Sequence, residues 1–334
     1  MRIFQYISIL AFFLIITGII YSNSAHYRII KGSVFGTYYN IKIRTPHKNK
    51  KLKKEIEAKL EQINKQMSVF DTDSEISQIN RLGRKKQKNI SKDFAVVLSV
   101  SHKIWTLSDG YFDPTIGKLI DIWGFGTSKP QNPDKSEVQK ALNSCGFDKL
   151  IFSNSYQTVQ KKNKDVVLNL SAIAKGYAVD EVARILDAKG YKDYLVEIGG
   201  EIKAKGSKSN NFDGWTIGIS KPQIGSNENL LYLTISNLAV ATSGNYRNFY
   251  HKGGQTYVHT ISPKNGYPVQ NDALSATVFH SSCMYADAHA TAIMSMGVKK
   301  GLDYADKNKL KVIIFDNNFN AVYSKEAALA FKGE

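Results

Sequence analysis

The chain of 334 residues is long enough for one large domain or two small ones, with a substantial core. Hydrophobic residues make up 43% of it and aromatic residues 11%, which is typical of a folded globular protein and excludes a disordered one. The formal net charge of +16 favours anionic partners, but the sequence carries no zinc-finger, basic-zipper or RNA-binding motif, so we expect no nucleic-acid partner.

The N-terminus is an apolar segment from Ile3 to Ile20, preceded by Arg2 and followed by small polar residues. This pattern is typical of a secretory signal peptide. A length of roughly 18 residues is also close to the minimum that spans a bilayer, so an uncleaved membrane anchor fits as well. Both alternatives predict an exported protein.

We therefore predict three parts of the chain. Residues 1–22 form the signal peptide or membrane anchor, residues 23–29 a polar and basic linker, and residues 30–334 one domain. Basic residues next to an apolar anchor suit a position beside an anionic membrane surface.

Strand and helix patterns alternate along the domain without an internal repeat. Alternating apolar residues predict a strand over 38–43, and apolar residues at three- and four-residue spacing predict a helix over 50–67. Ser74 is typical of the residue that caps a helix start, here a short helix over 74–80. Gly110 predicts the end of a helix over 94–108.

The second half of the domain continues this mixture. A turn over 111–115 leads into an apolar stretch, residues 166–170 have the pattern of a buried strand, and residues 172–188 that of a helix. Further strands are predicted over 194–198, 215–220, 231–236, 239–242, 276–279 and 312–315, and a further helix over 286–296. The mixture predicts a mixed α/β (α+β) fold in one continuous unit.

Asp287 and Thr291 lie four residues apart in the last predicted helix and therefore share one of its faces. A carboxylate and a hydroxyl oxygen are hard ligands that suit Mg²⁺. By itself the pair is also compatible with an Asp that caps the helix. His289 lies off this face, which favours a packed or surface histidine.

Two further segments combine small residues with groups that can contact a ligand. Residues 169–177 run from a strand into a helix, where free N–H groups and Lys175 can bind phosphate, or form an ordinary cap. Gly199 and Gly200 after a strand permit a tight turn or the close approach of a ligand. His259 can carry a proton, although a lone histidine is more often structural.

The two cysteines, Cys145 and Cys283, are far apart and show no metal-ligand spacing. They are either two buried free thiols or a disulfide, since export to an oxidising compartment permits pairing.

Nine motifs occur in order between about residue 30 and residue 300, and together they closely resemble the FAD:protein FMN transferase family (ApbE family). They are Gly36-Thr37-x-Tyr39, Met67-Ser68 with Ser74-Glu75-Ile76, Gly110 to Thr115, Trp123-Gly124-Phe125-Gly126, Ala174 to Asp180, Glu197-Ile198-Gly199-Gly200, Thr242-Ser243-Gly244, His259-x-Ile261-x-Pro263, and Ala286-Asp287-Ala288-x-Ala290-Thr291.

The resemblance implies an exported or membrane-tethered enzyme at the periplasmic face of the inner membrane. It implies that Mg²⁺ or Mn²⁺ assists cleavage of FAD and that FMN is transferred to a Thr or Ser hydroxyl of a target protein, with release of AMP. The expected partners are FAD and an acceptor subunit of a membrane electron-transfer complex.

The resemblance also implies roles for individual residues. Asp287 and Thr291 match the metal ligands, with backbone oxygens near Ala172 and Ala290, and His259 matches a histidine proposed to assist proton transfer. The positions that match the FAD contacts are Phe35, Phe70, Tyr111, Phe112, Asp113, Asn169, Lys175 and Ile261.

Two other functions remain open from the sequence. A metal-dependent FAD pyrophosphatase would use the same site on water and release FMN and AMP. A non-catalytic periplasmic flavin-binding protein would retain only the pocket.

Overall fold

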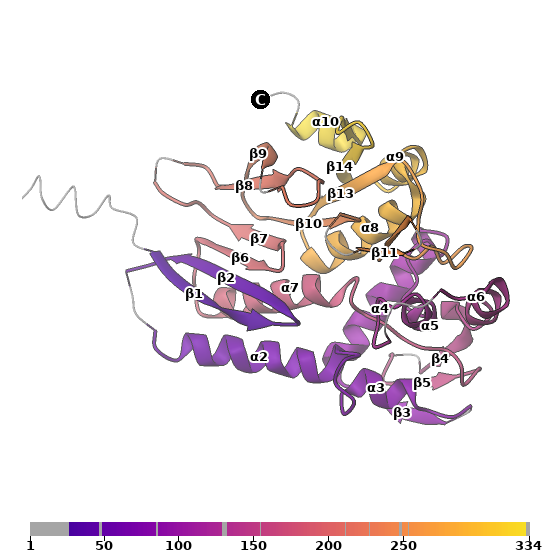
Figure 1. The fold of residues 1–334 in the computed structure, drawn as a ribbon. Coiled ribbons are helices and arrows are strands. Elements are labelled where there is room, and N and C mark those ends of the chain that lie inside the picture. Colours follow the sequence, from indigo (N-terminus) through magenta and orange to yellow (C-terminus); the bar gives the residue numbers. More distant parts are fainter. Residues whose placement is uncertain are drawn as a thin grey trace, which may run out of the picture.

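The computed structural model describes residues 27–331, apart from 47–48, 85, 129–131, 154, 211, 227, 247–248 and 253. Figure 1 shows these residues as a sheet with helices packed below and to one side of it. The segment 1–22, predicted as a signal peptide or anchor, lies outside the described residues. No helix within the described part of the chain is long and apolar enough to cross a membrane.

The centre of the fold is an eight-stranded sheet in the order β1-β2-β6-β7-β10-β13-β14-β15. Every neighbouring pair in it is antiparallel. The strands are β1 (Tyr27–Val34), β2 (Thr37–Arg44), β6 (Tyr194–Ile198), β7 (Glu201–Lys205), β10 (Leu238–Gly244), β13 (Ala273–His280), β14 (Lys311–Asp316) and β15 (Ala321–Tyr323). The single domain of mixed helices and strands confirms the predicted fold class.

Alternate side chains of one strand enter different cores, because successive residues of a strand point to opposite faces of the sheet. Val312 and Ile314 of β14 pack in the core beneath α8 (Cys283–Met296), whereas Ile313 and Phe315 pack in the core on the other face. Both faces of this sheet are therefore covered.

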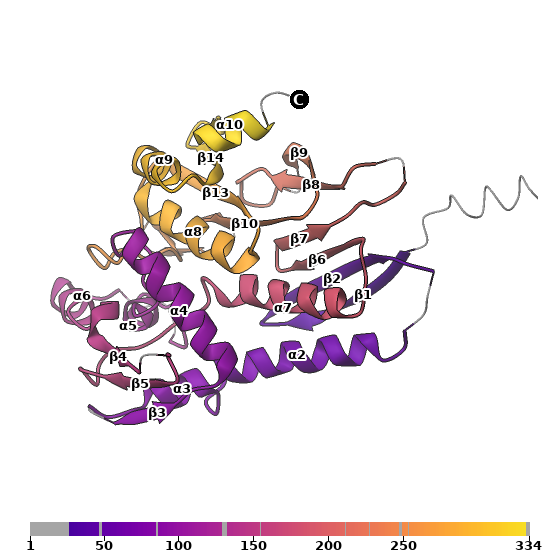
Figure 2. The same ribbon diagram turned by 180° about the vertical axis from the view of Figure 1, so that it is seen from behind.

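Four helices form the layers on the first face, seen from behind in Figure 2. α7 (Ala174–Ala188) and α8 lie against the strands, and α2 (Leu52–Met67) and α4 (Lys92–Leu107) pack beneath them. The apolar stripe predicted for α2 is fully buried at Leu52, Ile56, Leu60 and Ile63. Its burial, at about 2 kcal/mol for each side chain, holds the helix to the sheet.

The remaining elements are α3 (Glu75–Asn80), β3 (Gln87–Asn89), α5 (Gly117–Ile122), α6 (Lys135–Leu142), β4 (Leu150–Phe152), β5 (Thr158–Lys161), β8 (Trp215–Ser220), β9 (Asn229–Ile235), the hairpin β11 (Phe249–Lys252) and β12 (Gln255–Val258), α9 (Val298–Lys307) and α10 (Lys325–Phe331), with a 3₁₀ turn over Phe147–Lys149. Among them, α9 packs beside α8 on the first face, and β8, β9 and α10 pack in the core of the other face. Ser74 caps α3 as predicted, since its side chain accepts the N–H of Ser77.

Residues 166–170 do not form the predicted strand. A single bridge joins Val167 to Ile116, although Val166, Leu168 and Leu170 are buried as the pattern predicted. The backbone instead bonds to a side chain, because Asn80 donates to the Leu168 carbonyl at 2.9 Å and accepts its N–H at 2.8 Å. An apolar run alone does not distinguish a strand from such an extended segment.

The first strand begins earlier than the predicted domain boundary. β1 starts at Tyr27, inside the range 23–29 predicted as a linker, because Tyr27 already pairs with Arg44 of β2. The polar and basic residues of this range masked the strand in the sequence.

Candidate active site

One pocket of about 370 Å³ gathers most of the predicted site residues, from segments far apart in the chain. Its volume lies within the range of small-molecule sites. The predicted residues that line it are Phe70, Tyr111, Phe112, Asp113, Asn169, Ala172, Lys175, His259, Ile261, Asp287 and Thr291. The fold therefore brings eleven separately predicted residues to one place.

Asp287 and Thr291 project from α8 into this pocket on consecutive turns. The cap of α8 is Ser282, whose side chain accepts the N–H of Tyr285, so Asp287 does not cap the helix. Asp287 Oδ2 instead accepts the N–H of Gly176, 3.0 Å away in α7. A Cβ at Gly176 would lie 2.4 Å from the Cys283 carbonyl oxygen, so only glycine permits this close contact of the two helices.

Lys175 and Glu201 add two charges beside Asp287. Lys175 Nζ lies 3.4 Å from Glu201 Oε1, and Glu201 Oε2 is buried without a hydrogen-bond partner among the described residues. Burial raises the pKa of Glu201 to about 7 and raises that of Asp287, while the ammonium opposes both shifts. Burial lowers the pKa of Lys175, but the carboxylates of Asp287 and Glu201 outweigh it and hold the pKa above its usual value.

The donor set at α8 fits a divalent cation that prefers oxygen. Asp287 supplies a buried carboxylate, Thr291 a hydroxyl 3.2 Å from the hydroxyl of Ser243, and Ala172 lines the same wall of the pocket. The described residues contain no cluster of three His, Cys, Asp or Glu side chains suited to a metal, so nitrogen- or sulfur-rich sites do not fit. One carboxylate with hydroxyl and carbonyl oxygens is the chemistry of a Mg²⁺ or Mn²⁺ site.

Tyr111 and Phe112 form an aromatic wall at the mouth of the pocket. The Tyr111 ring lies between two ammonium groups, with Lys264 Nζ at 5.0 Å and Lys300 Nζ at 4.9 Å from its centroid. Lys300 also donates to the Tyr111 hydroxyl at 2.7 Å. These contacts place positive charge beside a ring that can stack on a flat ligand.

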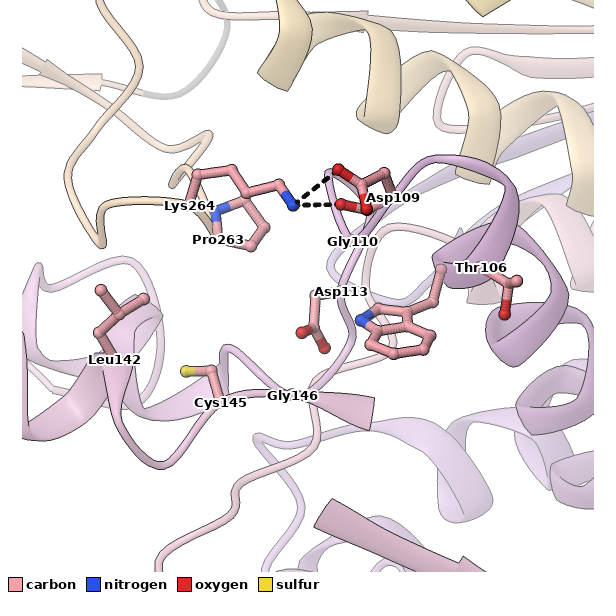
Figure 3. A pocket seen from close by; sticks show the side chains of 10 residues that line it. Thr106, Asp109, Gly110, Asp113, Leu142, Cys145, Gly146, Pro263 and Lys264 are labelled. Atoms are coloured by element: carbon pink, nitrogen blue, oxygen red, sulfur yellow. Dashed lines mark hydrogen bonds and ion pairs between the residues drawn. The ribbon is translucent and has the colours of Figure 1, made fainter. Parts of the chain in front are cut away.

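Asp113 lies in a wall shared by this pocket and a second cavity of about 380 Å³, shown in Figure 3. Its Oδ1 accepts the backbone N–H and the hydroxyl of Thr115, at 2.8 and 2.6 Å. Burial nevertheless raises the pKa of Asp113 to about 6. Figure 3 also shows Lys264 paired with Asp109 across this second cavity.

Asn169 reaches the pocket at the end of the extended segment that Asn80 holds. Its backbone N–H donates to the Pro114 carbonyl at 2.7 Å, and its Oδ1 accepts the N–H of Ser171 at 2.9 Å. The backbone hydrogen bond between Asn169 and Pro114 therefore joins the segment before α7 to the turn after Asp113 at the pocket wall.

His259 also lines the pocket and directly follows β12. Its ring is 6.4 Å from that of Phe125, edge to face, and the next two residues, Thr260 and Ile261, are buried. The backbone of this loop is fixed by bonds from Ser262 to Tyr267 and from Val269 to Thr260. The histidine therefore precedes a loop with a fixed backbone and lines the same pocket as the metal-ligand candidates.

Two predicted residues do not line the pocket. Phe35 lies in the turn between β1 and β2 with φ of 54° and packs against the main core. The Ala290 side chain is fully buried in the core beneath α8. His289 is packed as predicted, with Nδ1 2.7 Å from the Tyr304 hydroxyl. Cys145 and Cys283 are both buried free thiols.

Several residues of the pocket were not predicted as site residues. Ser243, Glu201, Phe125 and Ser295 all line it. Ser295 had a signal in the sequence, because it follows Thr291 by four residues on the same helical face. Phe125 had no such signal in the sequence apart from its motif, because its contact with His259 depends on the tertiary fold.

The fold and the pocket have the features of a small-molecule-binding enzyme site, and comparisons with known proteins identify the family. The sequence model of the ApbE family matches residues 35–314. The chain belongs to the ApbE family.

Curated relatives of this chain are named FAD:protein FMN transferase. The FAD:protein FMN transferase of Vibrio cholerae is 36% identical over 294 residues, which are 85% of this chain and 86% of that protein. That of Haemophilus influenzae is 34% identical over 91% of this chain and 90% of its own length.

Solved structures agree with these matches. Flavin transferase ApbE from Vibrio cholerae superposes with a TM-score of 0.83 at 33% identity, over 91% of this chain and 98% of that one. The apo form of Pseudomonas stutzeri flavinyl transferase ApbE superposes with a TM-score of 0.83 at 28% identity. The match covers 92% of this chain and 97% of that one. The predicted family is therefore confirmed.

Proposed function

We propose that this protein is an FAD:protein FMN transferase that cleaves FAD with the help of a divalent cation and attaches FMN to a Thr or Ser hydroxyl of an acceptor protein, releasing AMP. The observation that supports this best is that Asp287, Thr291 and His259 line one and the same pocket. The names of the relatives point to the same activity.

Different residues of the pocket would bind different parts of FAD. Tyr111 and Phe112 can stack on a ring system, and the ammonium group of Lys175 can bind the negative pyrophosphate. Asp287, Thr291 and the backbone near Ala172 would hold Mg²⁺ or Mn²⁺, which when bound neutralises charge on the pyrophosphate oxygens.

The transfer step forms one bond and breaks one. The acceptor hydroxyl oxygen bonds to the phosphorus of the FMN half, the P–O bond to the AMP half breaks, and AMP leaves with the electron pair. A hydroxyl is a weak nucleophile, so the imidazole of His259 takes its proton. The fixed backbone of the loop around Ile261 supports this base in the pocket wall.

We further propose that residues 1–22 export the protein and that it acts at the periplasmic face of the inner membrane. The support is the apolar segment from Ile3 to Ile20 with its preceding arginine. Separate analysis of the cytoplasmic, periplasmic and membrane fractions of the producing cell tests this, and a cytoplasmic pool alone contradicts it.

The transferase proposal is tested by incubating the purified protein with FAD, Mg²⁺ and a threonine-bearing acceptor protein. We expect a covalent flavin on the acceptor and one AMP for each flavin. Free FMN with AMP and no covalent product would instead identify an FAD pyrophosphatase, and unchanged FAD a binding protein.

The role of His259 is tested with His259→Ala. We expect transfer to fall by about 100-fold, within the range of general-base contributions, while the dissociation constant for FAD stays within about twofold. An equal loss of FAD binding would show that His259 binds FAD and does not serve as the base.

A further inference from the structure

A third cavity, of about 610 Å³, shares Ser295 with the active-site pocket and is not used by the proposed FAD site. We call it the side groove, and its walls include Trp123, Tyr257, Tyr267, Asn265, Gln270 and Ser295. The two cavities share Ser295, and the loop beginning at Ile261 separates them, with Ile261 in the pocket wall and Ser262 in the groove wall.

Ser295 marks the junction between pocket and groove. It is 8% exposed, and its Oγ has no hydrogen-bond partner among the described residues. A buried hydroxyl without a partner carries a desolvation cost, so a ligand that passes this point would gain a hydrogen bond. Its position two turns after Asp287 and one turn after Thr291 places it on the active-site face of α8.

A continuous set of rings also joins the groove to His259. Phe125 contacts His259 at 6.4 Å and Tyr250 at 5.2 Å between centroids. Tyr250 stacks on Tyr257 at 5.1 Å, directly across the β11–β12 hairpin, and Tyr257 stacks on Trp123 at 5.7 Å. These ring contacts therefore connect the wall of the groove to the residue that we propose as the base.

The chemistry of the groove differs from that of the pocket. None of its thirteen lining residues is Asp, Glu, Lys, Arg or His, although the protein has a formal net charge of +16. A phosphate or nucleotide in it would have no charged partner. Amide side chains such as Asn265 and Gln270 both donate and accept hydrogen bonds, and Tyr and Trp supply contact area, which suits a neutral polypeptide backbone.

We propose that the side groove binds the acceptor protein, through an extended and uncharged segment that flanks the reactive hydroxyl. The segment passes Ser295 and delivers its hydroxyl to His259 in the pocket. The proposal rests on the proposed transferase function and adds the place and the chemistry of the acceptor. At about 3.3 Å for each extended residue, a groove of this size takes a few residues on one side of the hydroxyl.

Two variants outside the FAD pocket test the groove in the full chain. Tyr267→Ala removes part of the aromatic wall that contacts Trp123 at 5.6 Å, and Gln270→Glu places a charge in the neutral groove. Gln270 is exposed, so its replacement should not affect folding. Gln223→Glu makes the same change at an exposed position after β8 and serves as the control.

The probes are two pools of synthetic nonapeptides with a central threonine. The flanking residues are Gly, Ala, Ser and Asn in the neutral pool, and Asp, Glu and Lys in the charged pool. Binding is measured by fluorescence anisotropy, FMN transfer by mass spectrometry, and FAD cleavage by water in a separate assay without peptide.

We expect the neutral pool to bind and to be modified. Tyr267→Ala and Gln270→Glu should each weaken peptide binding at least tenfold while FAD cleavage by water stays within twofold, and Gln223→Glu should match the wild type. The proposal is overturned if neither pool binds, if the charged pool binds as well as the neutral one, or if both variants bind as the wild type does. Groove-dependent binding without any FMN transfer would support the groove and contradict the transferase function.

Discussion

Lys175 of α7 and Glu201 of β7 form an ion pair with 3.4 Å between Nζ and Oε1, beside the buried carboxylate of Asp287. One ammonium thus faces two carboxylates in the pocket floor. Once both carboxyl groups are ionised, the arrangement carries net negative charge, which a divalent cation at Asp287 would neutralise.

Replacement of this lysine tests the electrostatics of the pocket. In EDTA, Lys175→Met should lower the free energy of unfolding by about 3 kcal/mol at pH 8, because the partner carboxylates lose their counter-charge. The folded pKa of Glu201, about 7, already exceeds its usual value of 4.5. Removing the cation raises it further, so the loss should be small near pH 5 and grow as the pH rises to 8.

Urea denaturation at several pH values measures this effect. Lys175→Arg keeps the charge and is the control. Added Mg²⁺ should stabilise Lys175→Met more than the wild type, and a loss that does not depend on pH would contradict the charge argument.

Removal of the metal carboxylate should abolish turnover. Asp287→Asn preserves an acceptor for the Gly176 N–H but loses the charge, so FAD cleavage at saturating Mg²⁺ should fall about 100-fold or more. Mg²⁺ binding measured by calorimetry should be lost in parallel. Asp303→Asn, at an exposed position on α9, is the control. Unchanged Mg²⁺ binding in Asp287→Asn would mean that the cation is held elsewhere.

Asp113 should titrate near pH 6 in the folded protein. Its folded pKa, about 6, lies above the usual 3.8 because the carboxyl group is buried. The folded state therefore binds the proton more tightly, and the stability that this group contributes at pH 4 is lost as the pH rises through about 6, by up to about 3 kcal/mol.

Carbon-13 NMR of the aspartate carboxyl groups measures this titration, with Asp113→Asn used to assign the resonance. A midpoint below pH 4.5 would show that the Thr115 hydrogen bonds outweigh burial.

Lys161 should be essential for the segment that carries Asn169. The side chain is fully buried, and Nζ donates to the carbonyls of Asn80, Lys164 and Val166 at 2.7, 2.8 and 3.0 Å. Lys161→Met leaves these carbonyls without partners and should lower the free energy of unfolding by about 3 kcal/mol or more.

The same variant should raise KM for FAD more than it lowers kcat, because the loosened segment leads to Asn169. Denaturation and steady-state kinetics check the two effects. Lys164→Met changes an exposed side chain of the same segment and should behave as the wild type. A change in stability below about 1 kcal/mol would mean that water replaces the ammonium at these carbonyls.

The periodic elements were predictable because their patterns are local. The stripe on α2 and the alternation in β6 identify helix and strand without reference to any neighbour, and both elements end within two residues of the prediction. The prediction of a strand over 166–170 was wrong because the backbone of Leu168 bonds to the side chain of Asn80, a residue 88 positions away. Short elements such as β3, β11 and α6 were not predicted, since three to eight residues carry too little periodicity.

The sequence by itself determined the family, the helical face shared by Asp287 and Thr291, and eleven of the residues that line the pocket, because these follow from the order and spacing of motifs. Only the tertiary structure decided that Ser282 and not Asp287 caps α8, that Lys175 pairs with Glu201, and that Ser295 lines both the pocket and the side groove. Those relationships depend on how α7, α8 and the strands pack against each other. Packing joins residues that no local pattern connects.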